Sequence, residues 1–273
     1  MCDKREKNMT RNNKGFTIME LLVAMLLAAI VTGAAMALYI TQHKQLIVQD
    51  QVTDTQSSVR AAESEIIRQV RMAGFKVPNN FSSLSNANTN PDSLFIAYNS
   101  DINHIEIAHQ MPLPSSELRC DGYDLSALHD DEWAYIYDPF ARIGEYFYID
   151  HVQFSDHIMH HEDLSRCYPA GSLILKINFY NFFVDQTDPS HPNLMRQYNG
   201  QAPQIYAENI TNLNCQFALS SGAIVDVPTV QDMIREVVIS VSGRTDKADA
   251  ESHNSYRIRT LNSRVKVRNL GVN

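Results

Sequence analysis

The chain has 273 residues, of which 44% are hydrophobic and 20% charged, and its formal net charge at pH 7 is −8. This composition suits one good-sized core with an appendage and excludes a disordered or fibrous protein. Residues 1–15 carry five basic and two acidic side chains, a local balance of +3, which leaves −11 for the rest of the chain. Phosphate binding requires a basic surface, so we expect no nucleic-acid partner.

A basic leader at residues 1–15 precedes an apolar segment at residues 16–40, whose one charged side chain is Glu20. A helix of this length spans about 37 Å, which is enough to cross a hydrocarbon core of roughly 30 Å. The positive charges ahead of the segment predict that the leader stays in the cytoplasm and that the chain after Tyr39 lies outside. We therefore predict a single membrane-spanning helix in contact with lipid.

Three interpretations of this apolar segment compete. Ala35-Met36-Ala37 fits the cleavage site of an ordinary signal peptide, which would release a secreted enzyme that begins at Leu38. A plain signal anchor is the second interpretation. Neither accounts for Glu20, because a carboxylate inside a membrane helix costs on the order of 3 kcal/mol without a partner.

The third interpretation rests on the stretch Gly15-Phe16-Thr17-Ile18-Met19-Glu20, which resembles the cleavage and methylation signal of type IV prepilins. The resemblance implies that a prepilin peptidase cuts between Gly15 and Phe16 and methylates the new amino terminus of Phe16. It also implies that Glu20, fifth in the mature chain, faces the terminal amine of a neighbouring pilin. A paired buried charge is tolerable where a lone one is not, so we interpret Glu20 as an assembly residue that sets register.

The next segment, residues 41–75, has an amphipathic pattern. Apolar side chains recur every three or four residues from Val48 to Ala73, and charged side chains occupy the other positions. No proline interrupts residues 16–77. We predict one helix of roughly 60 residues that ends near Gly74, with an apolar stripe that seats a sheet. The alternative is an ordinary core helix after an ordinary anchor.

Residues 76–92 are rich in Asn, Ser and Pro and are predicted to form a loop. Residues 93–273 contain short runs of β-branched and aromatic residues bounded by turn-forming residues. The runs are FIAY, HIEIAH, EWAYIYD, EYFYIDHVQF, SLILKINFYNFFV, NLNCQFAL, EVVISV and YRIRT. We predict an α+β fold in which a mostly antiparallel, β-rich periplasmic head packs on the long helix.

Two further stretches narrow the family. "RQVRMAGF" (68–75) and "YRIRTLNSRVKVRNLG" (256–271), with "MIREVVISVSGRT" before it, resemble minor pilins of the PilW type and the related J-type pseudopilins of type II secretion. The large head also favours a minor subunit. The resemblance implies a non-enzymatic inner-membrane protein that initiates or caps a type IV pilus. Its partners would be the major pilin, other minor pilins and the inner-membrane assembly platform. A minor pseudopilin is the alternative.

Three of the four cysteines would lie in the oxidising periplasm, because Cys2 belongs to the leader. These three allow three possible pairings, each with one thiol left over. Cys215 alternates with apolar residues in "NLNCQFAL", which indicates a small core side chain. Cys120 and Cys167 both adjoin turn signals, so we predict a disulfide between them, which would contribute on the order of 2 to 4 kcal/mol.

No metal, cofactor or catalytic centre is predicted. "DHIMHHED" (156–163) holds potential zinc ligands, but without an HExxH pattern we interpret it as a polar loop between strands. "TDKADAES" (245–252) lacks the EF-hand spacing. The chain contains no GxSxG, P-loop or strand-linked GxGxxG motif.

Basic side chains alternate near the end of the chain, at Arg257, Arg259, Arg264, Lys266 and Arg268. They could form a docking face for an acidic partner, or for DNA in a competence machine. We favour a solvated strand face whose basic residues form salt bridges with the acidic surplus.

Overall fold

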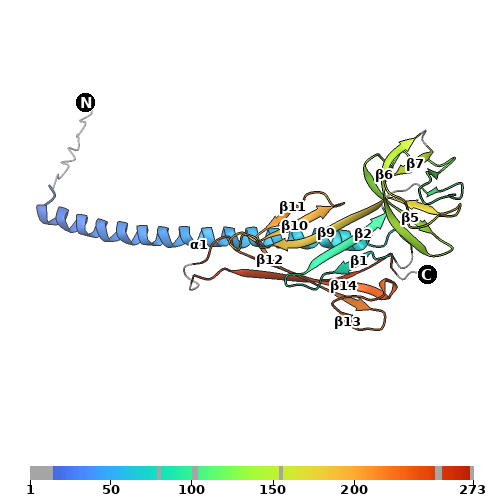
Figure 1. The fold of residues 1–273 in the computed structure, drawn as a ribbon. Helices are drawn as coiled ribbons and strands as arrows, with labels where there is room; N and C mark the ends of the chain where they lie inside the picture. The colour runs from blue at the N-terminus through green and yellow to red at the C-terminus, as the bar shows by residue number, and fades with distance from the viewer. Residues whose placement is uncertain (1–14, 79–80, 100–103, 154–155, 250–253, 271–273) are drawn as a thin grey trace, which may run out of the picture. The chain divides into compact units, whose positions relative to one another are not determined.

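The computed structural model describes residues 15–78, 81–99, 104–153, 156–249 and 254–270 (Figure 1). Contacts divide the chain into two compact units, Met1–Asp50 and Gln51–Asn273. Helix α1 (Ile18–Met72) contributes to both units. It confirms the predicted long helix, which begins and ends slightly inside the expected limits.

The first unit consists, in its described part, of the approach to α1 and the first half of this helix. Every described side chain up to Ile47 is exposed. By length and composition, the helix is apolar enough to cross a membrane, and none of its most apolar window is buried within the structure. An apolar helix without a protein partner in its own chain requires lipid or another subunit to cover it.

The second unit contains three sheets in which every pairing between described strands is antiparallel. The five-stranded sheet has the order β1 (Leu84–Asn86), β2 (Ser93–Asn99), β9 (Ile177–Asp185), β10 (Asn193–Tyr198), β11 (Gln204–Glu208). The four-stranded sheet has the order β13 (Ile224–Val225), β12 (Ile210–Leu219), β14 (Ile234–Arg244), β15 (Ile258–Lys266). The six-stranded sheet has the order β3 (Ile105–Glu106), β8 (Leu173–Leu175), β5 (Glu132–Asp138), β6 (Ile143–Gln153), β7 (His157–His160), β4 (Leu118–Arg119). A short 3-10 helix, η1 (Gln231–Met233), precedes β14. The α+β class is confirmed.

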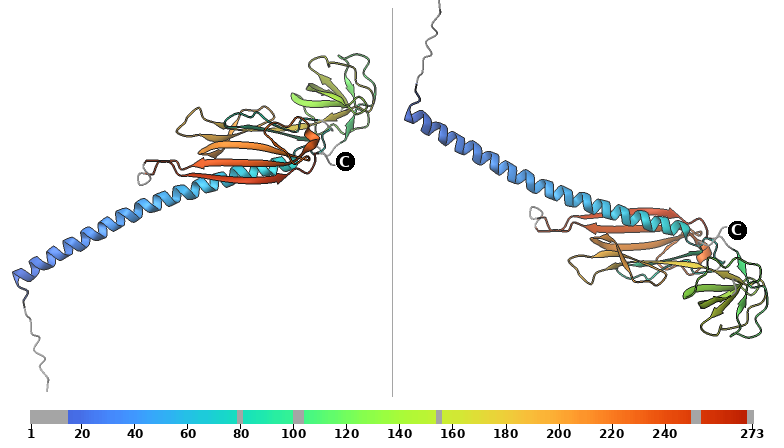
Figure 2. Two further views of the ribbon diagram at one scale, coloured as in Figure 1. Left: turned by 90° about the horizontal axis from the view of Figure 1, so that it is seen from below. Right: turned by 90° about the horizontal axis from the view of Figure 1, so that it is seen from above.

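The second half of α1 packs on the main core of this unit, and β14 and β15 lie along it in both views of Figure 2. The apolar stripe predicted from sequence is buried from Thr55 onward, through Val59, Ile66 and Val70. The helix approaches β14 so closely that a Cβ at Gly243 would lie 2.6 Å from Cγ2 of Val59. The apolar stripe of the helix therefore packs against a sheet, as the spacing of its residues predicted.

The carboxyl end of α1 is capped from a distant part of the chain. The side-chain amide of Asn269 lies 3.2, 3.4 and 3.2 Å from the carbonyl oxygens of Arg71, Met72 and Ala73. Gly74 follows with a φ of 76°, and a Cβ there would lie 2.5 Å from the side chain of Leu270. These contacts satisfy carbonyl groups that the end of a helix leaves without partners.

The six-stranded sheet has its own core, which the sequence analysis did not predict. This core includes Ile136, Phe147, Ile149, Ile158 and Tyr168, all buried. Two segments predicted as loops also differ from expectation. Residues 76–92 contain β1, whose Leu84 is buried, and residues 156–163 contain β7, whose Ile158 is fully buried. β1 is placed by pairing with β2, the next strand, and β7 by pairing with β6 directly before it and with the more distant β4.

Candidate assembly site at the start of the helix

Glu20 lies in the first turn of α1 and bonds to Thr17, which precedes the helix. The backbone N–H of Thr17 donates to Oε2 of Glu20 at 2.9 Å, and the Thr17 hydroxyl donates to the same oxygen at 3.0 Å. In return, the N–H of Glu20 donates to the Thr17 hydroxyl at 3.2 Å. This reciprocal arrangement is a capping box, which satisfies backbone donors at the start of a helix.

The capping box corrects one step of the sequence argument, which treated Glu20 as lacking any partner in its own chain. The pattern Thr-x-x-Glu directly before an apolar run was readable from the sequence and was missed. The box engages Oε2 in both bonds, whereas Oε1 accepts no hydrogen bond from a described residue. The carboxylate therefore keeps one oxygen available for a partner while it caps its own helix.

The predicted cleavage junction is accessible in the described structure. Phe16 is 85% exposed, and Gly15 is exposed as well. A Cβ built at Gly15 would meet nothing within 4 Å, and the backbone there does not adopt a positive φ. The chain's own packing and conformation thus do not require glycine at this position.

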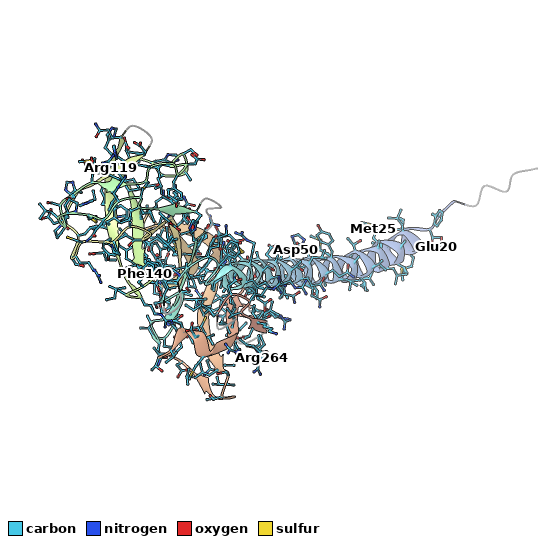
Figure 3. All side chains as sticks on the ribbon, turned by 90° about the vertical axis from the view of Figure 1, so that its right-hand side faces the viewer. Glu20, Met25, Asp50, Arg119, Phe140 and Arg264 are labelled. Carbon is cyan, nitrogen blue, oxygen red and sulfur yellow. The ribbon has the colours of Figure 1, made fainter. Side chains whose placement is uncertain are left out.

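Apolar side chains surround Glu20 on the helix surface. Met19, Val23, Ala24 and Leu27 line a shallow groove together with it. Figure 3 shows Glu20 near the start of α1, with Met25 a little further along. A neighbouring helix that covered this groove would remove water from the carboxylate, which then requires a positively charged partner.

Residues 10–36 match the family model described as the prokaryotic N-terminal methylation motif. The match contains Gly15, Phe16 and Glu20. It supports a prepilin-like, membrane-anchored protein of the type IV pilin or pseudopilin class, and it points to a structural subunit rather than an enzyme. Such a motif implies processing by a prepilin peptidase and assembly with other pilins. A comparison with curated proteins gives no match.

The cysteines occupy two different cores. Cys120 is buried in the core of the six-stranded sheet and Cys167 packs against the same core, whereas Cys215 is buried in the main core. All three are free thiols in the structure, so the Cys120–Cys167 disulfide stays a prediction. Burial, followed by the nearby charges of Asp121 and Asp156, raises the pKa of the Cys120 thiol to about 12.

The basic residues near the end of the chain are exposed, and two of them form ion pairs. Arg257 lies 2.5 Å from a carboxylate oxygen of Asp249, and Arg264 pairs with Glu236. These two ion pairs agree with the interpretation of this segment as a solvated strand face with salt bridges. The remaining three basic side chains, Arg259, Lys266 and Arg268, are exposed without an ion pair among the described residues.

One group of potential metal ligands comes together among the described residues. Donor atoms of Asp121, Asp156 and His157 all lie within 4.8 Å of one another. Arg119 lies among them, because its Nε donates to Nε2 of His157 at 3.0 Å and its Nη2 lies 3.7 Å from Asp121. The guanidinium group already supplies positive charge to the carboxylate of Asp121, which disfavours binding of a second cation there.

Proposed function

We propose that this protein is a minor pilin that copolymerises through α1 and initiates or caps a type IV pilus. It is inserted in the bacterial inner membrane with its β-rich head in the periplasm. The observation that carries the proposal is the combination of an exposed Gly15–Phe16 junction and a capped Glu20 at the start of an uncovered apolar helix.

Gly15 supports recognition by an external enzyme. Neither packing nor backbone conformation in this chain requires a glycine there, so its small size fits the requirement of a peptidase for the residue before the cut. Cleavage would turn the backbone nitrogen of Phe16 into an amine, and a methylated amine remains protonated at neutral pH. The subunit would then carry one positive and one negative group within its first five residues.

The capping box allows Glu20 to act within and between subunits. Oε2 stays with Thr17, and Oε1 accepts from the protonated Phe16 amine of a neighbour. Lateral packing of α1 helices covers the groove around Glu20, so the pair forms away from water. An unpaired carboxylate there is strongly unfavourable, and correct register between helices is the arrangement that avoids it.

Gly33 also fits helix–helix assembly. It lies within α1, where glycine costs roughly 1 kcal/mol relative to alanine, and a Cβ there would meet nothing within 4 Å. With Ala34 and Ala35 it forms a small-residue patch that permits close approach of another helix.

A minor pseudopilin of type II secretion is the second candidate. Its assembly would use the same helix and the same charge pair, and the sequence resemblance extends to the J-type. A deletion strain separates the two, because loss of pili supports the pilus subunit and loss of protein secretion supports the pseudopilin. A secreted enzyme behind an ordinary signal peptide is less favoured.

Amino-terminal sequencing and mass measurement of the mature protein test the assignment directly. We expect the chain to begin at a methylated Phe16. A start at Leu38 would instead demonstrate ordinary secretion, and retention of residues 1–15 would exclude processing altogether. Either result would overturn the proposed function.

Substitution of Glu20 tests the charge pair. We expect Glu20→Ala to insert in the membrane normally and to be incorporated into filaments at least about tenfold less than wild type, because the neighbour's amine loses its partner. Fractionation followed by immunoblotting of sheared filaments measures both quantities.

Thr17→Val is the matched control for this substitution. It removes the hydroxyl of the capping box at a cost of about 1 kcal/mol but keeps the carboxylate. We expect its incorporation to stay close to wild type. If Thr17→Val and Glu20→Ala are reduced equally, the role of Glu20 is helix capping and the pairing mechanism is wrong.

A further inference from the structure

The hairpin formed by β5 and β6 has two unlike faces. One face carries Ala134, Ile136, Phe147 and Ile149, all buried in the core of the six-stranded sheet. The other carries two cross-strand aromatic pairs, Trp133 with Tyr148 and Tyr135 with Tyr146. Their ring centroids are 5.3 and 4.8 Å apart. The second face of an antiparallel sheet is commonly polar, so an aromatic face requires an explanation.

This aromatic face opens onto a cleft of about 1310 Å³ that also reaches the five-stranded sheet. Tyr146 packs against Phe179 of β9, with ring centroids 5.2 Å apart. Phe179 in turn packs against Phe95 of β2, with ring centroids 5.5 Å apart. Phe81 packs edge-on against Tyr135, with their ring centroids 5.1 Å apart. The cleft is therefore lined by a continuous series of aromatic rings from both sheets.

The rings remain partly accessible. Trp133 is 57% exposed and Tyr146 is 40% exposed. Gly144 makes room for Tyr135, because a Cβ at this glycine would lie 2.6 Å from the Tyr135 ring and 2.5 Å from the carbonyl oxygen of Ile136. The close approach fixes the position of the Tyr135 ring, which remains partly exposed.

Hydrogen-bonding groups are interleaved with the rings. Within the described residues, the hydroxyls of Tyr135 and Tyr146 form no hydrogen bond, so both can donate to or accept from a ligand. Asn181 and Asn199 use their carbonyl oxygens to accept from Ser93 and from the backbone of Phe179, at 2.9 and 2.7 Å. Among the described residues the NH₂ group of Asn181 forms no hydrogen bond and remains for a ligand, whereas the side chain of Asn199 also hydrogen-bonds to Tyr198.

The charged groups of the cleft disfavour an anionic ligand. Glu132 and Lys176 form an ion pair at 2.8 Å. Glu145 accepts hydrogen bonds from Ser165 and Tyr168 but has no ion pair among the described residues, and Asp131 adds a further carboxylate to the lining. Three carboxylates against one ammonium leave a net negative charge, which repels phosphate, sulfate and carboxylate groups.

The strands beside the cleft are interior to their sheets but are not paired along their whole length. β5 lies between β8 and β6, and β9 lies between β2 and β10. β7 pairs only with residues of β6 from Ile149 to Gln153, so residues 144–146 have no strand partner on that side among the described residues. Strand addition by a peptide requires such an edge, so binding of an extended peptide is one of the outcomes of the test below.

We propose that the cleft binds an uncharged oligosaccharide. A pyranose ring presents C–H groups on its faces, which stack on aromatic rings, and hydroxyls around its rim, which pair with phenol and amide groups. The volume is sufficient for several sugar units. This inference concerns the head alone and does not depend on how α1 assembles.

The test uses the full-length mature protein in a detergent without a sugar headgroup. Maltohexaose, cellohexaose and chitohexaose are the neutral probes, and a heparin hexasaccharide is the anionic probe. We expect at least one neutral probe to bind at millimolar concentration and the heparin probe not to bind. Failure of all three neutral probes, or preferential binding of heparin or of an extended peptide, would overturn the proposal.

Variants then locate the binding. Trp133→Ala and Tyr146→Ala should each reduce the affinity for the neutral probe about fivefold or more. Tyr146→Phe keeps the ring and should reduce the affinity less. Phe140→Ala is the matched control, because Phe140 is 82% exposed but does not line the cleft. Circular dichroism confirms that each variant is folded. Equal affinity in all four folded variants would place the binding elsewhere and refute the assignment.

Discussion

Glu65 is a charged residue on the buried stripe of α1, with 7% of its side chain exposed. Its carboxylate lies 2.7 Å from Arg68, 2.9 Å from the side-chain amide of Gln69 and 3.5 Å from Arg196 of β10. Burial acts to raise the pKa of Glu65, but the hydrogen bonds and positive charges outweigh it, and the pKa lies below its ordinary value. The ion pair thus connects the helix to the five-stranded sheet.

Removal of this carboxylate should destabilise the head. We expect Glu65→Ala to lower the free energy of unfolding by about 1 to 3 kcal/mol, because the buried side-chain amide of Gln69 loses its acceptor and Arg196 loses its partner. Thermal unfolding followed by circular dichroism measures the effect. Asp54→Ala, an exposed change on the same helix, serves as control. Equal melting temperatures for the two variants would show that the Glu65 ion pair contributes nothing.

The thiols of Cys120 and Cys167 give a second prediction at the residue scale. We propose that they form a disulfide in the periplasm, since Cys120 belongs to the core of the six-stranded sheet and Cys167 packs against the same core. Alkylation under denaturing, non-reducing conditions followed by mass measurement should label Cys215 and neither of the other two. Labelling of Cys120 without reductant would refute the pairing.

At the scale of elements, the close packing of α1 on β14 depends on Gly243, which has no side chain. A Cβ at Gly243 would meet Cγ2 of Val59 at 2.6 Å and the carbonyl oxygen of Asn209 at 3.2 Å. The helix therefore lies closer to this strand than any other residue would allow. Close approach increases the dispersion contacts between the helix stripe and the sheet.

Gly243→Ala should force the helix away from β14 and lower the free energy of unfolding by about 1 to 3 kcal/mol. Ser240→Ala, on the opposite face of the same strand, should have little effect. A double variant with Val59→Ala should recover part of the loss, because the two sites interact directly. Strictly additive effects would mean that strain at Asn209, not helix packing, causes the loss.

Local patterns in the sequence predicted some elements well and others poorly, for physical reasons. The run EWAYIYD matches β5 to the residue, since alternation in a strand with one buried face is strong. β7 was missed because His157 and His160 surround its one buried apolar residue, Ile158, and pairing with β6 and β4 decides its conformation. The Thr17–Glu20 capping box was readable but overlooked.

The cleft could not be predicted from sequence at all. Its aromatic wall joins Tyr146 of one sheet to Phe179 of another, and the separate core that positions β6 depends on contacts between distant segments. Sequence periodicity indicates which face of a strand is apolar, but not which other strand it meets. In contrast, Gly15, Phe16 and Glu20 lie within six consecutive residues, so their motif can be recognised from the sequence without knowledge of the fold.

For the whole molecule, several carboxylates have a pKa below the ordinary value because of local hydrogen bonds or charges. They are Glu65, Glu106, Asp121, Asp130, Asp185 and Asp188. A lowered pKa in the folded state stabilises the fold above the unfolded pKa, about 4.3 for Glu and about 3.9 for Asp. That contribution is lost as the pH falls through the folded pKa.

We therefore expect the melting temperature of the head to be nearly constant from neutral to mildly acidic pH and to fall steadily below about pH 4.5. Circular dichroism melts across this range measure it. In Glu65→Gln the acid-induced decrease should be smaller, because the least exposed of these carboxylates no longer titrates. A melting temperature that rises on acidification would contradict the sign of these pKa shifts.

Asn269 binds three carbonyl oxygens at the end of α1, yet it follows them by 196 to 198 residues. In the topology proposed above, the end of the helix is synthesised and exported long before this amide. Until then the carbonyl oxygens of Arg71 and Ala73 lack the amide of Asn269, while that of Met72 keeps its bond from the backbone of Phe75. A subunit cut short before Asn269 would therefore carry a helix without this cap, although its first half would be complete.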